Sequence, residues 1–90
     1  MQVLKNYKFK MRDGLPVIPR NFHSAIFQHT YNSLLSMYTK IVREKDGYAI
    51  YMDTHLGHDM NGWEFVKLSA LKDKISYYLK EDVLIELKLK

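Results

Sequence analysis

The chain has 90 residues, with 14 Lys and Arg against 10 Asp and Glu, which gives a net charge of +4. The absence of cysteine excludes disulfides and thiolate zinc sites. No apolar stretch approaches the ~18 residues that a membrane-spanning helix needs. A chain of this length has room for one hydrophobic core, so we expect a single domain over residues 1–90. The N-terminus lacks the apolar run of a signal peptide, so an intracellular, cytoplasmic protein is predicted.

The first half of the chain predicts a strand followed by a long helix. Residues 3–12 (VLKNYKFKMR) alternate apolar and polar side chains, which is the period of a strand. After Asn21, a suitable N-cap, apolar residues recur at steps of three and four along residues 22–45. This spacing predicts a helix of roughly 20 residues with a broad apolar stripe. Asp46 and Gly47 would end it, because glycine readily adopts the left-handed conformation.

The second half predicts two strands, a helix and a final strand. Residues 48–53 (YAIYMD) and 63–68 (WEFVKL) read as strands that a hairpin joins. Ser69 would cap a helix over residues 70–79 (ALKDKISYYL). Residues 83–90 (VLIELKLK) alternate most regularly. The inward-facing side chains of this last strand should be Val83, Ile85, Leu87 and Leu89.

The order strand, helix, strand, strand, helix, strand predicts an α+β, ferredoxin-like βαββαβ fold. Its four-stranded antiparallel sheet would carry both helices on one face and leave the other face open. One alternative is that residues 15–19 (LPVIP) pair back on the first strand and add a strand. Strand 63–68 could bury either Val66 and Leu68 or Trp63 and Phe65. We favour the first arrangement because it buries fewer charged groups.

The open face of such a sheet would place aromatic rings beside ammonium groups. Rings stack nucleic-acid bases at about 1–3 kcal/mol each, and lysines neutralise phosphates. We therefore predict a small non-enzymatic protein that binds single-stranded RNA or DNA through a basic, aromatic sheet face. The predicted contact residues are Lys8, Lys10, Arg12, Tyr51, Trp63, Phe65, Lys67 and Lys88.

Residues 61–68 (NGWEFVKL) resemble the third-strand signature of the RNA recognition motif, which reads basic, glycine, aromatic, small, aromatic, valine. The matching positions are Gly62, Trp63, Phe65 and Val66. Asn61 stands where the motif has a basic residue, and Glu64 stands where it has a small one. The resemblance implies that the two rings stack on bases.

The same open face would also suit a protein partner. The chain has seven tyrosines, and tyrosine is enriched at protein interfaces. Lysines along a sheet also prevent sheets from aggregating, without any role in phosphate binding. The alternative function is therefore a protein-interaction module or homodimer, such as a viral or mobile-element accessory protein that inhibits a host factor. No cofactor is expected for either function.

The histidines are the main candidates for metal binding or catalysis. His55 and His58, with Asp59 beside them, have the side chains that zinc and other divalent ions bind, which would suit a metal-dependent nuclease or hydrolase. A polar loop that binds no metal is the more common origin of this pattern. His29 borders the apolar stripe of the predicted helix, where a hydrogen-bonded structural histidine is usual, although acid–base chemistry with a tyrosine is conceivable. No catalytic motif accompanies these residues, so we predict a protein that is not an enzyme.

Overall fold

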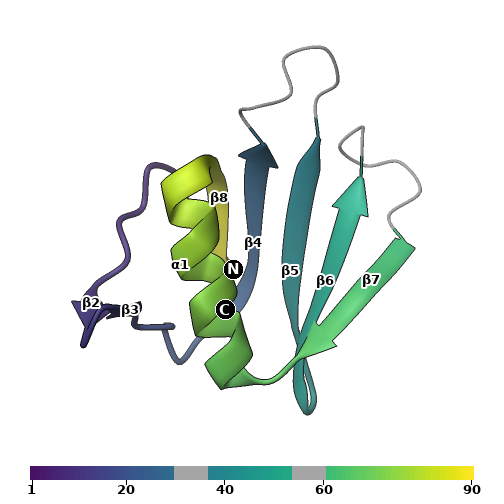
Figure 1. Cartoon of the computed structure of the whole chain (residues 1–90), viewed down its shortest axis with the longest axis horizontal. Helices are drawn as coiled ribbons and strands as arrows, with labels where there is room; N and C mark the ends of the chain where they lie inside the picture. The colour runs from purple at the N-terminus through teal and green to yellow at the C-terminus, as the bar shows by residue number, and fades with distance from the viewer. Residues whose placement is uncertain (30–36, 54–60) are drawn as a thin grey trace.

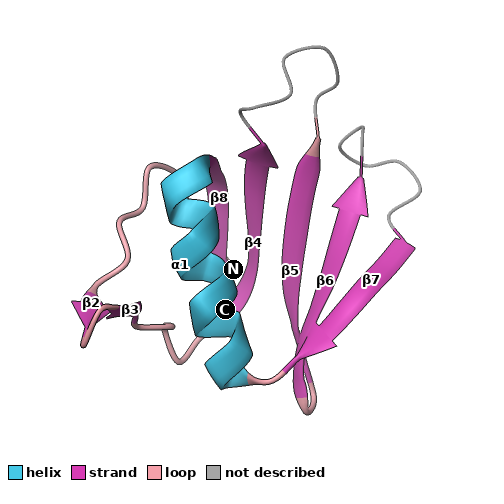
Figure 2. Cartoon of the chain, in the orientation of Figure 1, coloured by secondary structure: helices cyan, strands magenta, loops and turns pink. Residues whose placement is uncertain are grey.

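A six-stranded antiparallel sheet forms most of the protein, and a helix packs on one of its faces (Figures 1 and 2). This computed structural model describes residues 1–29, 37–53 and 61–90. The elements are β1 (Gln2–Leu4), β2 (Met11–Arg12), β3 (Leu15–Pro16), β4 (Phe22–His29), β5 (Tyr38–Glu44), β6 (Gly47–Asp53), β7 (Asn61–Val66), α1 (Leu68–Glu81) and β8 (Asp82–Leu89). Within these residues, no helix has the length and apolar character to cross a membrane.

The strand order in the large sheet is β1-β8-β4-β5-β6-β7, and every neighbouring pair is antiparallel. Strands β4 to β7 are neighbours in chain order. The chain then runs through α1 and returns as β8, which lies between β1 and β4. Strands β2 and β3 form a separate two-stranded sheet beside α1 (Figure 1).

The predicted ferredoxin-like βαββαβ fold is wrong, and so is the α+β class with two helices on a four-stranded sheet. The expected helix over residues 22–45 is replaced in the described part by β4 and β5. Strand β4 lies in the middle of the sheet, and its residues Ser24 to Phe27 are all buried. A strand that is buried on both faces loses the alternation that identifies strands, and its apolar run can imitate a helix. In β5, Thr39, Ile41 and Val42 are β-branched, which favours a strand.

The predicted first strand is also divided. Only its two ends are strands, β1 and β2, and Asn6 between them has a positive φ of 58°. A left-handed residue of this kind interrupts an extended run. The alternative pairing of residues 15–19 is confirmed in part, because β3 pairs with β2 in the small sheet. The buried side chains of Phe9 and Pro16 attach this region to the rest of the protein.

The second half of the chain follows the prediction closely. Strands β6 and β7 pair as a hairpin, α1 covers the expected helix, and β8 is the final strand. Val66 is buried and Phe65 is 53% exposed, as the favoured arrangement requires, although Leu68 begins the helix instead of facing inward. Lys67, not Ser69, is the N-cap residue.

A bulge in β8 corrects the predicted facing of that strand. Leu87 and Leu89 point into the core as expected. The register with β4 then shifts between Glu86 and Leu84, so that Ile85 is the extra residue. Leu84 consequently packs against the core, and Val83 is 48% exposed.

The hydrophobic core lies between α1 and the sheet. Leu71, Ile75 and Tyr78 are the buried residues of α1. The Tyr78 ring lies 5.3 Å from that of Phe27 in β4, measured between centroids. An ion pair of 2.9 Å between Lys74 and Glu64 also joins α1 to β7. We call this side of the sheet the covered face. Its core side chains include Phe22, Ala25, Phe27, Ile41, Tyr48, Ile50, Val66, Leu87 and Leu89.

Candidate functional site

The opposite side of the sheet, here called the uncovered face, has no helix or strand packed over it in the described part of the chain (Figure 2). Directly opposed residues on neighbouring strands share a face, so the strand registers define its members. Its described members are Val3, Ser24, Ile26, Gln28, Tyr38, Lys40, Val42, Glu44, Gly47, Ala49, Tyr51, Phe65, Val83, Glu86 and Lys88.

Apolar and aromatic side chains form most of the uncovered face. Phe65 is 53% exposed near one edge of the sheet, and Val3 and Val83 are each 48% exposed toward the other. Between them, Ile26 in β4 is only 8% exposed, and Lys40 and Glu86 lie directly opposite it on the neighbouring strands. The Phe65 ring lies over Gly47, where a Cβ atom would come within 2.8 Å of the ring. The result is a broad surface that is apolar with scattered polar groups.

The charges of the uncovered face nearly cancel. Lys40 and Lys88 are its described cations, and Glu44 and Glu86 are its described anions. The Lys88 Nζ atom lies 3.5 Å from Glu86 Oε1. The strongly basic sheet face expected from the sequence is therefore not what these strands present.

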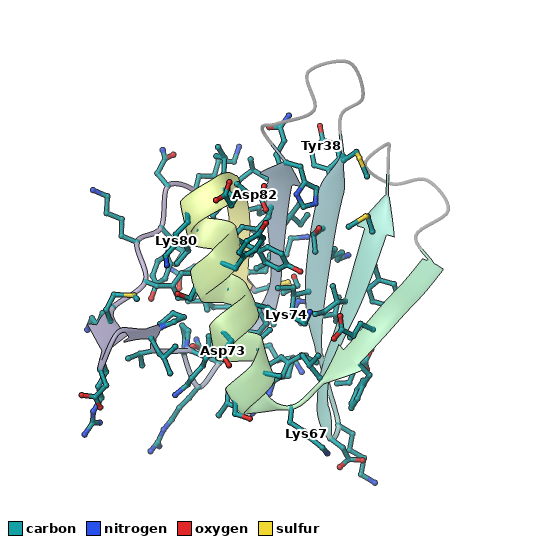
Figure 3. The ribbon with its side chains drawn as sticks, in the orientation of Figure 1. Tyr38, Lys67, Asp73, Lys74, Lys80 and Asp82 are labelled. Carbon is teal, nitrogen blue, oxygen red and sulfur yellow. The ribbon has the colours of Figure 1, made fainter. Side chains whose placement is uncertain are left out.

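The eight predicted contact residues fall into separate places. Tyr51, Phe65 and Lys88 lie together on the uncovered face. Trp63 lies in β7, but its side chain is outside the described part of the structure. Lys67 lies at the start of α1, and its Nζ donates to the backbone oxygen of Asp46 at 2.7 Å (Figure 3). The remaining three belong to the N-terminal region beside α1, and they are Lys8, Lys10 and Arg12.

A buried polar cluster joins three neighbouring strands on the covered face. His29 Nε2 lies 2.6 Å from Thr39 Oγ1, and His29 Nδ1 lies 3.1 Å from Asp82 Oδ1. Figure 3 shows Asp82 where α1 ends and β8 begins. The Tyr78 ring approaches the imidazole edge-on, with centroids 6.4 Å apart. These residues tie β4 to β5 and β8.

This order of hydroxyl, imidazole and carboxylate is also used to activate nucleophiles. Thr39, however, has no exposed surface, and the side chains of His29 and Asp82 are 4% and 1% exposed. A substrate cannot reach a hydroxyl that is buried in this way. We therefore assign the cluster a structural role, in agreement with the hydrogen-bonded structural histidine expected at His29. Thr39 and Asp82 were missed because no local pattern joins them to a histidine that is distant in sequence.

A shallow depression of about 450 Å³ lies where the β5–β6 turn meets the start of α1. Its charged lining mixes both signs, since Arg43, Lys45 and Lys67 stand beside Glu44 and Asp46. Such a mixed lining has no clear preference for a charged ligand.

The predicted metal ligands His55, His58 and Asp59 lie outside the described residues. Among residues 1–29, 37–53 and 61–90, no group of three His, Cys, Asp or Glu side chains is placed to hold a metal ion. No protein-family model, curated protein or solved structure matches the chain, so its surfaces carry the functional argument.

Proposed function

We propose that this protein is a protein-interaction module that forms a homodimer through the uncovered face. The observation that carries the proposal is the apolar character of this face. Eight of its fourteen described side chains are apolar or aromatic, and Phe65, Val3 and Val83 are each about half exposed. Sheets pack face to face about 10 Å apart by interdigitating side chains of this kind.

The charge balance favours a second copy over a polyanion. An isologous interface brings the same surface of both subunits together, so it needs complementary groups within one surface. Lys40, Lys88 and Glu86 provide both signs on the uncovered face. A nucleic-acid backbone would meet Glu86 among few cations, and repulsion would weaken its binding.

The size of the face is sufficient for a stable dimer. Six strands at about 4.8 Å spacing, each with about six paired residues at 3.3 Å, cover about 600 Å². Two copies would then bury about 1,200 Å², which reaches the range of specific protein interfaces.

Sedimentation equilibrium tests the proposal with Phe65→Lys and Val83→Lys. Each variant would place an unpaired charge inside the interface, so both should sediment as monomers and the wild type as a dimer. Tyr77→Lys is the matched control, because Tyr77 is 60% exposed on α1, away from the uncovered face. It should remain dimeric. Circular dichroism should show the same folded spectrum for all four proteins.

A monomeric wild type would contradict the proposal, as would a control that dissociates like the two face variants. The predicted base-stacking function is tested in the same series. If the wild type is monomeric and Phe65→Ala weakens its binding to single-stranded RNA, the nucleic-acid function replaces the dimer.

A further inference from the structure

The N-terminal segment, defined as residues 5–20, concentrates positive charge on the side of the molecule that carries α1. Its five cations are all exposed, and Asp13 is its only acid. No ion pair joins these five side chains to an acid within the part of the chain that the structure describes. The cations are Lys5, Lys8, Lys10, Arg12 and Arg20.

The core holds the backbone of this segment in place. Phe9 is 8% exposed, and the ring of Tyr7 packs edge-on against it with centroids 5.1 Å apart. Pro16 is fully buried, and the Val17 amide donates to the Lys10 carbonyl at 2.7 Å. The backbone positions that carry the cations are therefore set before any ligand binds, which lowers the backbone part of the entropic cost of binding.

Three of the five cations are also close together in the chain. Lys8, Lys10 and Arg12 are two residues apart, so an extended backbone spans at most about 14 Å from the first to the last. Buried Phe9 separates the two lysines, which places them on the solvent side of the segment. The three charges thus form one short strip.

Helix α1 adds a fourth cation to this strip. Lys72 and Arg12 line a shallow depression of about 410 Å³ together with Asp13, Leu15 and Val17. The depression therefore receives positive charge from two parts of the chain and contains one acid.

From this arrangement we infer that the N-terminal segment, with Lys72, binds the phosphate backbone of a nucleic acid. Lysine and arginine contacts of this kind neutralise phosphates and release counterions, without reading base sequence. The inference does not rest on the proposed dimer, because the strip and the uncovered face are formed by different residues.

Fluorescence anisotropy with a labelled 20-nucleotide single-stranded DNA tests this inference. Four phosphate contacts predict a slope of log K against log salt of about −2.8, which is about a 50-fold loss of affinity between about 50 and 200 mM. Lys10→Gln and Arg12→Gln should each reduce the magnitude of the slope by about 0.7. Lys45→Gln is the matched control, because Lys45 is exposed on the β5–β6 turn between two acids. It should leave the slope unchanged.

Two further arms identify the source of the phosphates. A duplex of the same length should show a larger slope per contact, about −0.9, if it binds through the same cations. Vesicles with and without phosphatidylserine test an anionic membrane. The inference is overturned if neither DNA binds at about 50 mM salt, if Lys45→Gln weakens binding as much as Lys10→Gln, or if only the anionic vesicles bind. Equal thermal unfolding midpoints of the variants would exclude misfolding as the cause of lost binding.

Discussion

The two faces of the six-stranded sheet are built from the same strands, but α1 covers only one of them. On the covered face, Phe27, Ile41 and Leu87 have no exposed surface, and α1 closes the core over them. On the uncovered face, Phe65 and Val83 are about half exposed, although the face is also mainly apolar. The first face explains why the chain folds, and the second provides apolar surface that the fold itself does not use. This difference separates residues that set stability from residues that are available for association.

The polar groups of the two faces differ in the same way. His29, Thr39 and Asp82 lie together in the core, where each is shielded from water. Lys88 and Glu86 are 3.5 Å apart, with side chains 34% and 27% exposed. Removing a partner is costly in the buried cluster, because the remaining group cannot hydrogen bond to water instead. Water compensates for most of the loss at the partly exposed pair.

The largest loss of stability is expected from truncating a buried side chain on the covered face. Phe27→Ala removes a fully buried ring that packs against Tyr78, and should lower the free energy of unfolding by about 4 kcal/mol. Val42→Ala, on the uncovered face, removes a half-buried side chain and should cost about 1 kcal/mol. Urea unfolding at low protein concentration, where the dimer does not contribute, measures both changes. Equal losses would show that the two faces do not differ as described.

Removing one member of the buried polar cluster should give the next largest loss of unfolding free energy. Asp82→Ala leaves His29 without its carboxylate neighbour in the core, and we expect a loss of about 3 kcal/mol in unfolding free energy. Glu86→Ala in the same strand serves as the control, and its effect should stay within about 0.5 kcal/mol. Chemical denaturation of the two variants side by side makes the comparison. A cost below about 1 kcal/mol for Asp82→Ala would mean that the cluster does not stabilise the fold.

The smallest of the three losses tests whether the Phe65 ring packs against Gly47 on the uncovered face. In Gly47→Ala, the added Cβ atom would lie 2.6 Å from the Val66 carbonyl oxygen and 2.8 Å from the Phe65 ring. Such overpacking should cost about 2 kcal/mol of unfolding free energy. The same change in a Phe65→Ala background should cost less, because only the carbonyl contact remains. Equal costs in both backgrounds, measured by urea unfolding, would show that the ring does not lie against Gly47.

The sequence predicted the second half of the fold because its elements are amphipathic. Strand β6 alternates between buried residues such as Ile50 and the partly exposed Tyr51, and α1 has an apolar stripe through Leu71 and Ile75. Both have one side facing the core, so the period of the apolar residues indicates the type of element. The exposure of Phe65 followed from the same reasoning.

The first half could not be predicted in this way because β4 is buried on both faces. Ile26 serves the uncovered face and Phe27 the covered face, so the period of two is lost from the sequence. The bulge at Ile85 has a similar effect in β8, since one extra residue reverses the facing of Val83 and Leu84. The polar cluster depends on the registers of three strands, which no local pattern contains.

The position of β8 also determines when the protein can fold. This strand is the last element that the structure describes, yet it lies second in the sheet order, where it pairs with both β1 and β4. During synthesis, β4 therefore has an unpaired edge until residues 82–89 have left the ribosome. Contacts between such distant segments form slowly, and an exposed edge strand readily pairs with other chains. A nascent or truncated chain without β8 is thus the form of this protein most exposed to aggregation.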